Sequence, residues 1–400
     1  MAKGENRSIW NRVYTCAFFA NLLLCISQHM ANTLISTYAS FLGAGAVLVG
    51  MISGLYFGVA FAARPVSGPV ITLLDKKKIM LVTYALGVVT NVAYAASGTV
   101  PMFIMARVLH GLQFAFVGSL NLTIASDSLP PEKLGSGIGV FGIGASIAQA
   151  IAPSIGIAIR DWGIGRWGER GGYTAVFLSA AFVMLLATLA ALLIPSRKPT
   201  AEERAVIGKW YRNIVSTETI LPALLLCFVS MSSILYTSYM VPYAAELGVA
   251  GIGSFFTVYA VGLVVTRPLF GRLSDRVGPE KVVVPGVLLF AVSFVFIGMA
   301  RSLPVLLAGA VFGALGYGAL NPILQTICIR TVVPERRGVA SNTQYFGIDL
   351  GYFVGPMLGG LLYDRSGTYS SMYLIGGIVP LCVTLVLFLL VWGRLKKRLY

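Results

Sequence analysis

Twelve apolar segments, each about as long as a bilayer is thick, follow one another along this sequence of 400 residues. An apolar run of about 20 residues spans the hydrocarbon core as an α-helix, because a helix makes all of its backbone hydrogen bonds within the segment. The sequence therefore predicts an all-α membrane protein with twelve transmembrane helices. They are expected near residues 13–37, 46–67, 79–97, 101–125, 136–159, 172–194, 219–243, 252–270, 282–300, 304–327, 338–362 and 372–393.

Charged residues are too scarce for a soluble fold. They make up 11% of the chain, against about 25% in an average soluble domain. The net charge is +15, yet the basic residues separate the apolar segments instead of forming one face. The expected partner is thus the lipid bilayer, and no nucleic acid is expected to bind.

The distribution of Lys and Arg predicts the orientation of the chain, because cytoplasmic loops are enriched in them. With the N-terminus inside, the inner segments hold 24 of the 30 basic residues. Both termini are therefore predicted to be cytoplasmic, in the inner (plasma) membrane of a cell. The longest polar stretch, 195–218, is interpreted as a cytoplasmic linker between six-helix bundles at 1–194 and 219–400.

An offset of 203 residues brings the two halves into register without gaps. The matched pairs include Arg64 with Arg267, Pro65 with Pro268, Gly68 with Gly271, Pro131 with Pro334, Glu132 with Glu335, Gly135 with Gly338, Pro153 with Pro356 and Gly156 with Gly359. A parallel repeat of this kind predicts a binding site between the bundles near the bilayer midplane, and transport by rocking one bundle against the other.

The loop after the eighth predicted helix carries the motif Arg267-Pro-Leu-Phe-Gly271-Arg-Leu-Ser-Asp275-Arg276. With the repeat, this motif resembles the major facilitator superfamily (MFS) over nearly the whole chain. The resemblance implies a conformational latch, in which an Asp pairs with an Arg and steadies the outward-open state. The implied latch residues are Arg267, Gly271, Asp275 and Arg276, with Arg64 and Gly68 in the first half. There the loop diverges, since Thr72 stands where Asp275 does; alternatively, these charges serve only as topology signals.

Arg107 lies within the fourth predicted helix, in the stretch Arg107-Val-Leu-His110-Gly111-Leu-Gln113, which is similar to the family's fourth-helix pattern. A charge within a span is costly and is expected to face a cavity or a partner rather than lipid. Arg107 could bind a substrate carboxylate, take part in proton coupling, or bond backbone carbonyls in a structural role. The eleventh predicted helix resembles the family's antiporter signature at Gly351–Gly360, and the fifth matches it weakly.

Asp349 is the only acidic residue deep in a predicted helix. A carboxylate at such a depth is costly unless it takes up a proton or lies beside a cation. We interpret it as the first candidate for proton coupling or substrate binding. The alternative is a static partner for Arg107 or for a hydroxyl. The equivalent residue of the first half is Ser146.

Polar residues of the first predicted helix indicate one wall of the cavity. Gln28, Asn32 and Ser36 share a helix face at i, i+4 spacing, and His29 lies beside them. His29 is a further candidate for proton coupling or substrate binding, although a single His is more often a satisfied buried residue. Other candidate cavity-lining residues are His110, Gln113, Tyr236, Tyr239, Asn321, Gln325 and Gln344.

The favoured function is secondary transport, and the resemblance is to the twelve-helix drug and metabolite efflux branch. It implies proton-coupled export of a small amphipathic or zwitterionic organic molecule. The alternative is uptake or exchange of small organic anions, with Arg107 binding the substrate. An enzyme is not expected, because two histidines and one deep carboxylate supply too few reactive groups. A receptor would be expected to carry a larger soluble domain. The expected partners are the substrate and protons; the chain is expected to be monomeric, with no cofactor or metal.

Overall fold

The computed structural model describes residues 9–44, 46–196, 202 and 209–399. Its long elements are all α-helices, and short 3₁₀ turns precede three of them. The helices are α1 (Arg12–Thr33), α2 (Ile35–Phe41), α3 (Ala46–Leu73), α4 (Lys76–Ala96), α5 (Val100–Asp127), α6 (Leu134–Leu192), α8 (Ile220–Glu246), α9 (Gly253–Val277), α10 (Glu280–Gly298), α11 (Leu303–Arg330), α12 (Arg337–Ser366) and α13 (Tyr369–Leu399). The 3₁₀ turns are η1 (Pro131–Lys133), η2 (Trp210–Asn213) and η3 (Pro334–Arg336).

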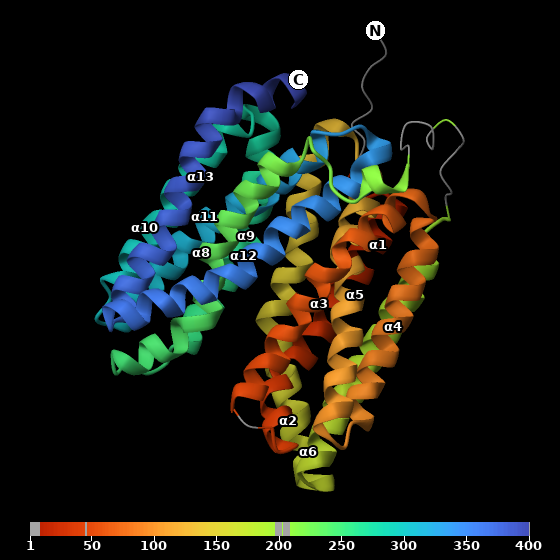
Figure 1. Ribbon diagram of the computed structural model, residues 1–400, viewed down its shortest axis with the longest axis vertical. Helices are drawn as coiled ribbons and strands as arrows, with labels where there is room; N and C mark the ends of the chain where they lie inside the picture. Colours follow the sequence, from red (N-terminus) through yellow and green to blue (C-terminus); the bar gives the residue numbers. More distant parts are fainter. Residues whose placement is uncertain (1–8, 45, 197–201, 203–208, 400) are drawn as a thin grey trace.

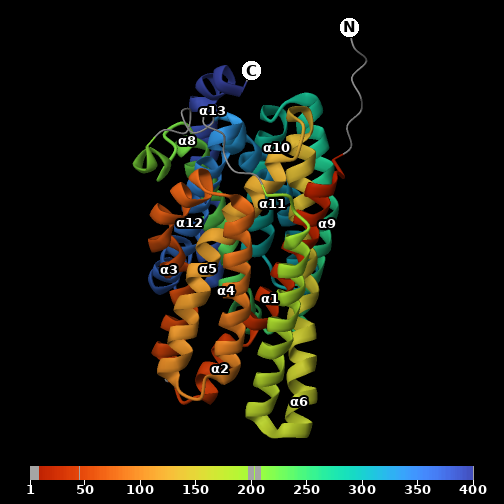
Figure 2. The same cartoon turned by 90° about the vertical axis from the view of Figure 1, so that its right-hand side faces the viewer.

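These helices supply the twelve membrane-spanning segments predicted from the sequence. α1 and α2 together form one span, Arg12–Phe41. α6 contains two spans, because Gly168 reverses the chain with φ 72° and ψ 179°. Figure 2 shows this hairpin extending farthest from the end that holds the termini. The predicted all-α membrane fold is confirmed.

The helices form two bundles, α1–α6 and α8–α13, which lie side by side (Figure 1). The repeat predicted from the sequence is visible in the element bounds, since α11 and η3 begin 203 residues after α5 and η1. Each bundle has its own buried apolar core. The predicted linker 195–218 falls partly outside the described residues, which include η2 at its end.

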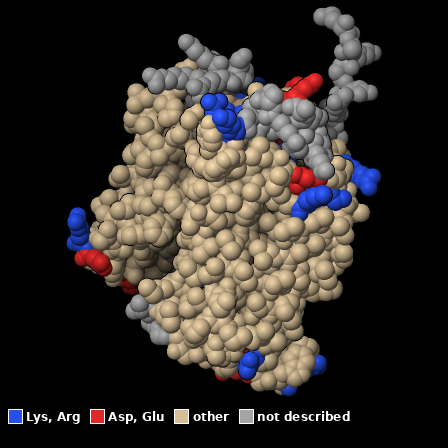
Figure 3. All heavy atoms as spheres, turned by 45° about the vertical axis from the view of Figure 1, so that its right-hand side comes forward, with Lys and Arg blue, Asp and Glu red and all other residues tan. Residues whose placement is uncertain are grey.

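The outer surface suits a lipid environment. Val82, Met105 and Leu390 are among the large apolar side chains exposed on it. Figure 3 shows a broad uncharged middle on the visible face, with charged side chains towards its edges. Such a surface is stable against lipid tails and would be costly in water.

The bundles touch along two interfaces, α3 with α12 and α6 with α9. Both interfaces lie at the end where α1 begins and α13 ends, while the other ends of the bundles diverge (Figure 1). The surface is recessed between the bundles on that divergent side (Figure 3). The molecule is therefore closed on the side of its termini and open on the other.

Candidate functional site

A buried ion pair joins the two bundles. Nε of Arg64 on α3 donates to Oδ2 of Asp349 on α12 over 2.9 Å, and the side chains are 0% and 1% exposed. Nη1 of Arg64 also donates to the carbonyl oxygen of Ala115 on α5 at 2.7 Å. Because water does not solvate these charges, each depends on the other for its stability.

Aromatic rings enclose this pair. The guanidinium carbon of Arg64 lies 4.9 Å from the ring centroid of Tyr345 and 5.9 Å from that of Phe114. Tyr345 fits there because Gly118 has no side chain: a Cβ would lie 2.8 Å from the ring. Within the described residues, Oδ1 of Asp349 has no hydrogen-bond partner. It can accept a proton without first giving up another bond.

This geometry changes two expectations. Arg64, named among the latch residues, pairs with an Asp across the bundle interface, but it lies well before the end of α3 rather than in the loop that follows. Asp349 was offered as a partner for Arg107, but its cation is Arg64. The position of Arg64 within α3 explains why it is the cation that meets Asp349. Arg64 lies one helical turn before Gly68, in the part of α3 that packs on α12.

Among the described residues, no ion pair joins α6 to α9 as Arg64 and Asp349 join α3 to α12. Arg267 on α9, the repeat equivalent of Arg64, donates from Nη1 to the carbonyl oxygen of Gly142 on α6. Ser146, the equivalent of Asp349, donates to the same carbonyl at 3.3 Å. The arginine of the repeat therefore meets a carboxylate at one interface and a backbone oxygen at the other.

Arg107 is held within the first bundle. Its Nη1 donates to Oδ1 of Asn32 at 2.6 Å and its Nε to the carbonyl oxygen of Ile52 at 3.1 Å. The ring of Tyr56 lies 4.7 Å from its guanidinium carbon and 4.7 Å, between centroids, from the ring of His110. The structure thus brings the predicted site residues Asn32, Arg107 and His110 into one cluster.

The remaining polar residues of the first helix do not form one continuous face. Gln28 and His29 are half-buried on α1, whereas Ser36 is exposed on α2. The helix breaks at Leu34, where φ is −106° and ψ is 2°. The i, i+4 spacing assumed an unbroken helix, and this break offsets Ser36 from Gln28 and Asn32; that Ser36 lines the cavity stays a prediction.

Several predicted cavity residues lie in helix packing instead. Gln113 fills space left by Gly87 on α4, where a Cβ would lie 2.2 Å from its Nε2. The hydroxyl of Tyr236 bonds to Ser293 inside the second bundle, and that of Tyr239 donates to the carbonyl oxygen of Pro356. Gln344 is fully buried. Sequence spacing could not show which face of each helix meets its own bundle.

Asn321 and Gln325 belong to a hydrogen-bonded chain that reaches α12. Nε2 of Gln325 donates to Oδ1 of Asn321 at 2.8 Å, and Nδ2 of Asn321 donates to the hydroxyl of Tyr317 at 3.1 Å. That hydroxyl is 3.2 Å from the hydroxyl of Tyr352, one turn beyond Asp349. Sequence reasoning missed Tyr317, although its i, i+4 spacing to Asn321 was a usable signal.

Asn342 is another residue that the sequence analysis missed. Its Nδ2 donates to the carbonyl oxygen of Arg64 at 2.8 Å, and its Oδ1 accepts from the hydroxyl of Ser67 at 2.7 Å. An Asn within an apolar segment was the available signal, because such a group needs a polar partner. Together these bonds extend the polar contact between α3 and α12 towards the closed end.

The predicted latch takes the form of a helix cap. Lys133, the N-cap of α6, makes no side-chain cap bond. Asp275 at the end of α9 accepts instead from the N–H groups of Gly135 at 3.0 Å and Ser136 at 2.7 Å. A carboxylate is favourable there because it meets unpaired N–H groups at the positive end of the helix dipole. The cap crosses from one bundle to the other.

The arginine beside this cap is not the expected one. Arg276 is exposed, and Arg330 on α11 lies 3.4 Å from the carboxylate of Asp275. Arg276 was named among the latch residues, but it follows Asp275 directly on the helix and points in a different direction. In the first half, Asp75 caps its own helix α4 and Thr72 packs on Gly338 of α12, in line with the divergence seen in the sequence.

We expect Asp275→Ala to weaken closure on the side of the termini. Losing a cap costs about 1 kcal/mol, so the ratio of open to closed molecules on that side should rise about fivefold. Spin labels on cysteines replacing the exposed Glu132 and Lys281 would report it as a larger population of long distances. Asp364→Ala, at the far end of α12, should leave the distances unchanged; equal distances in all three proteins would contradict the cap.

No three His, Cys, Asp or Glu side chains in the described part of the chain come together in a way that could hold a metal ion. The chemistry of the site therefore consists of charge pairing and hydrogen bonding at the α3–α12 interface, beside the Arg107 cluster. This arrangement can bind, exclude or release a proton or an organic ion.

Comparisons with known proteins agree with the fold. The family model of the Major Facilitator Superfamily matches residues 17–250 and 220–398. The multidrug resistance protein MdtG of Citrobacter koseri is 26% identical over an alignment that covers 97% of this chain and 96% of that protein. For MdtG of Klebsiella pneumoniae, the identity is 26% and the coverage 95% and 93%.

Solved structures share the architecture at low identity. The MFS transporter FucP in the outward conformation superposes with a TM-score of 0.76 at 13% identity, covering 96% of this chain and 98% of that one. The proton:xylose symporter XylE gives 0.75 at 14%, covering 96% and 95%. These likenesses show the fold. The family match over both halves of the chain shows that this multi-pass membrane protein belongs to the major facilitator superfamily of transporters, which are not enzymes.

Proposed function

We propose that this transporter exports a small amphipathic or zwitterionic organic molecule in exchange for protons. Its termini are taken to be cytoplasmic, in the inner (plasma) membrane of a cell, so the conformation described above is the outward-facing state. The bundles at 1–194 and 219–400 are the moving parts, with 195–218 as linker. Since both bundles belong to one chain, a monomer suffices for transport.

The relatives support export. Proteins named for multidrug resistance align with this chain over nearly its full length. We take resistance to many drugs as support for removal of organic compounds from the cell. Arg107 and Tyr56 form a buried cluster of a cation and an aromatic ring within the first bundle, and we assign to it the anionic and apolar parts of the substrate when the bundles rearrange.

The ion pair between Arg64 and Asp349 carries the proposal for proton coupling. It exists only where α3 and α12 meet, so it stabilises the outward-facing state selectively. A proton that reaches Asp349 from outside removes the attraction and favours opening towards the cytoplasm. There the proton leaves, substrate binds, and the pair forms again as the protein returns. Each cycle thus exchanges protons for substrate.

The direction of transport can be measured in proteoliposomes. We impose a proton gradient across the liposome membrane. We expect ethidium, a hydrophobic cation, or norfloxacin, a zwitterion, to move in the direction opposite to the flow of protons, at a rate that rises with the gradient. Liposomes without protein, and protein with the gradient collapsed by an ionophore, are the controls. Flux of either probe that ignores the gradient would contradict proton coupling. Uptake of an organic anion such as benzoate along with protons would favour the anion symporter instead.

A further inference from the structure

A groove of about 400 Å³ opens between α8, α12 and α13 on the second bundle. Leu358, Leu361, Ile375 and Val379 line it and are all exposed, so the groove faces the lipid side of the bundle. Gly376 also lines the groove. An apolar groove on a surface covered by hydrocarbon is filled by hydrocarbon, because water there would lack hydrogen-bond partners.

A single cation stands at one end of this groove. Arg365 lines it and lies in the last turn of α12, which ends at Ser366. This end of the helix lies on the open side of the molecule, where a span leaves the hydrocarbon and meets the lipid headgroups. None of the ion pairs among the described residues includes Arg365.

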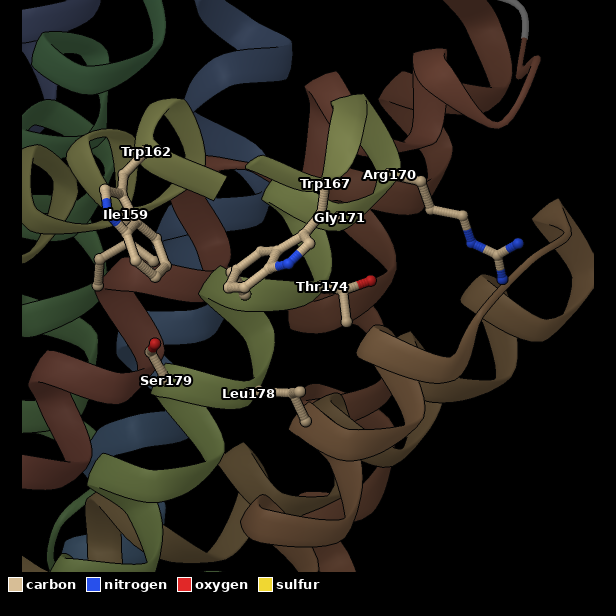
Figure 4. A pocket seen from close by; sticks show the side chains of 9 residues that line it. Ile159, Trp162, Trp167, Arg170, Gly171, Thr174, Leu178 and Ser179 are labelled. Carbon is tan, nitrogen blue, oxygen red and sulfur yellow. The ribbon is translucent and has the colours of Figure 1, made fainter. Parts of the chain in front are cut away.

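The first bundle provides an internal comparison. A second groove, of about 600 Å³, lies between the two spans of α6 (Figure 4). Ile159 and Trp162 line it at the positions equivalent to Leu362 and Arg365 under the 203-residue repeat. Here an indole replaces the guanidinium, and Figure 4 shows Arg170 pointing away from Trp167. The first groove is not free of cations, since Arg170 also lines it and Arg166 lies 4.5 Å from the ring of Trp162. The repeat position of Arg365 itself, however, carries an indole in the first bundle.

We propose that the α8–α12–α13 groove binds one phospholipid of the leaflet on the open side, with its phosphate on Arg365 and an acyl chain along Leu358 and Val379. The guanidinium suits a phosphate because its N–H groups can donate to two oxygens at once. The lipid contacts α12, the helix that carries Asp349. An effect of the lipid on transport rests on the proposed function; the binding itself does not.

Native mass spectrometry of the delipidated full-length protein tests the headgroup contact, with palmitoyl-oleoyl-phosphatidylglycerol as the titrant. We expect Arg365→Gln to weaken the tightest lipid adduct about fivefold, the effect of one cation near a membrane surface. Arg301→Gln removes an exposed cation at the start of α11, on the same side of the molecule, and should leave the adduct unchanged. Equal affinity in wild type and Arg365→Gln would overturn the proposal, as would inorganic phosphate alone competing for the site.

The acyl-chain contact is tested independently of Arg365. Val379→Trp fills the groove from its exposed side, and we expect loss of the same adduct. Val386→Trp places the same bulk on an exposed position of α13 outside the groove and should retain it. A monodisperse elution profile shows that each variant is folded. Two results would contradict the assignment of the lipid to this groove: retention of the phospholipid adduct in Val379→Trp, or displacement of the phospholipid by ethidium.

Discussion

Asp349→Asn is expected to abolish proton-driven transport and to destabilise the protein by about 3–5 kcal/mol, the usual cost of leaving one member of a buried ion pair without its partner. Arg64 is fully buried and would keep its charge. Asparagine retains an oxygen that can accept from Nε, so the substitution removes the charge rather than the hydrogen bond. Thermal unfolding of the purified protein and gradient-driven flux of ethidium measure the two effects.

A double substitution separates stability from coupling. Arg64→Gln with Asp349→Asn removes both charges, so it should be more stable than either single variant. It should nevertheless remain insensitive to the proton gradient, because the carboxylate that takes up the proton is gone. Arg267→Gln is the matched control, since Arg267 meets a backbone carbonyl rather than a carboxylate. Wild-type flux in Asp349→Asn would refute the role given to this residue.

The fold was predictable because lipid imposes a simple rule on sequence. A span must be apolar, about 20 residues long and helical, and a duplication repeats that pattern at a fixed offset. The bounds of α5 and α11 differ by the same 203 residues that the sequence comparison found. Breaks were harder to foresee: nothing in the apolar pattern indicates that the first span divides at Leu34.

The site was only partly predictable, for a different physical reason. Hydropathy locates Asp349 at depth but does not tell which of two arginines it meets. That choice depends on how far α3 and α12 overlap, which is set by packing of residues such as Gly68 against Asn342. Besides Arg330, the partners of Asp275 are backbone N–H groups, which every residue type carries, so the sequence does not reveal them.

Gly271→Val is expected to hold the protein open on the side of the termini. A Cβ at Gly271 would lie 2.8 Å from the carbonyl oxygen of Gly135 and 3.2 Å from Cα of Ser136. Because these are backbone atoms of another helix, no side chain can move aside, and α6 and α9 must separate. Separation would also break the Asp275 cap. Spin labels at positions 132 and 281 should then show long distances in nearly all molecules, and export should be lost.

The matched control lies on the same helix. Gly253, at the start of α9, has nothing within 4 Å of an added Cβ, so Gly253→Val changes the same residue type without forcing helices apart. It should keep the distances and the transport of wild type. A short distance retained in Gly271→Val would mean that α9 can tilt without opening the interface, and the glycine contact would not be a closure device. If the labels separate but export persists, closure between α6 and α9 is not required in the cycle. Alternating access by opening and closing this interface would then be refuted.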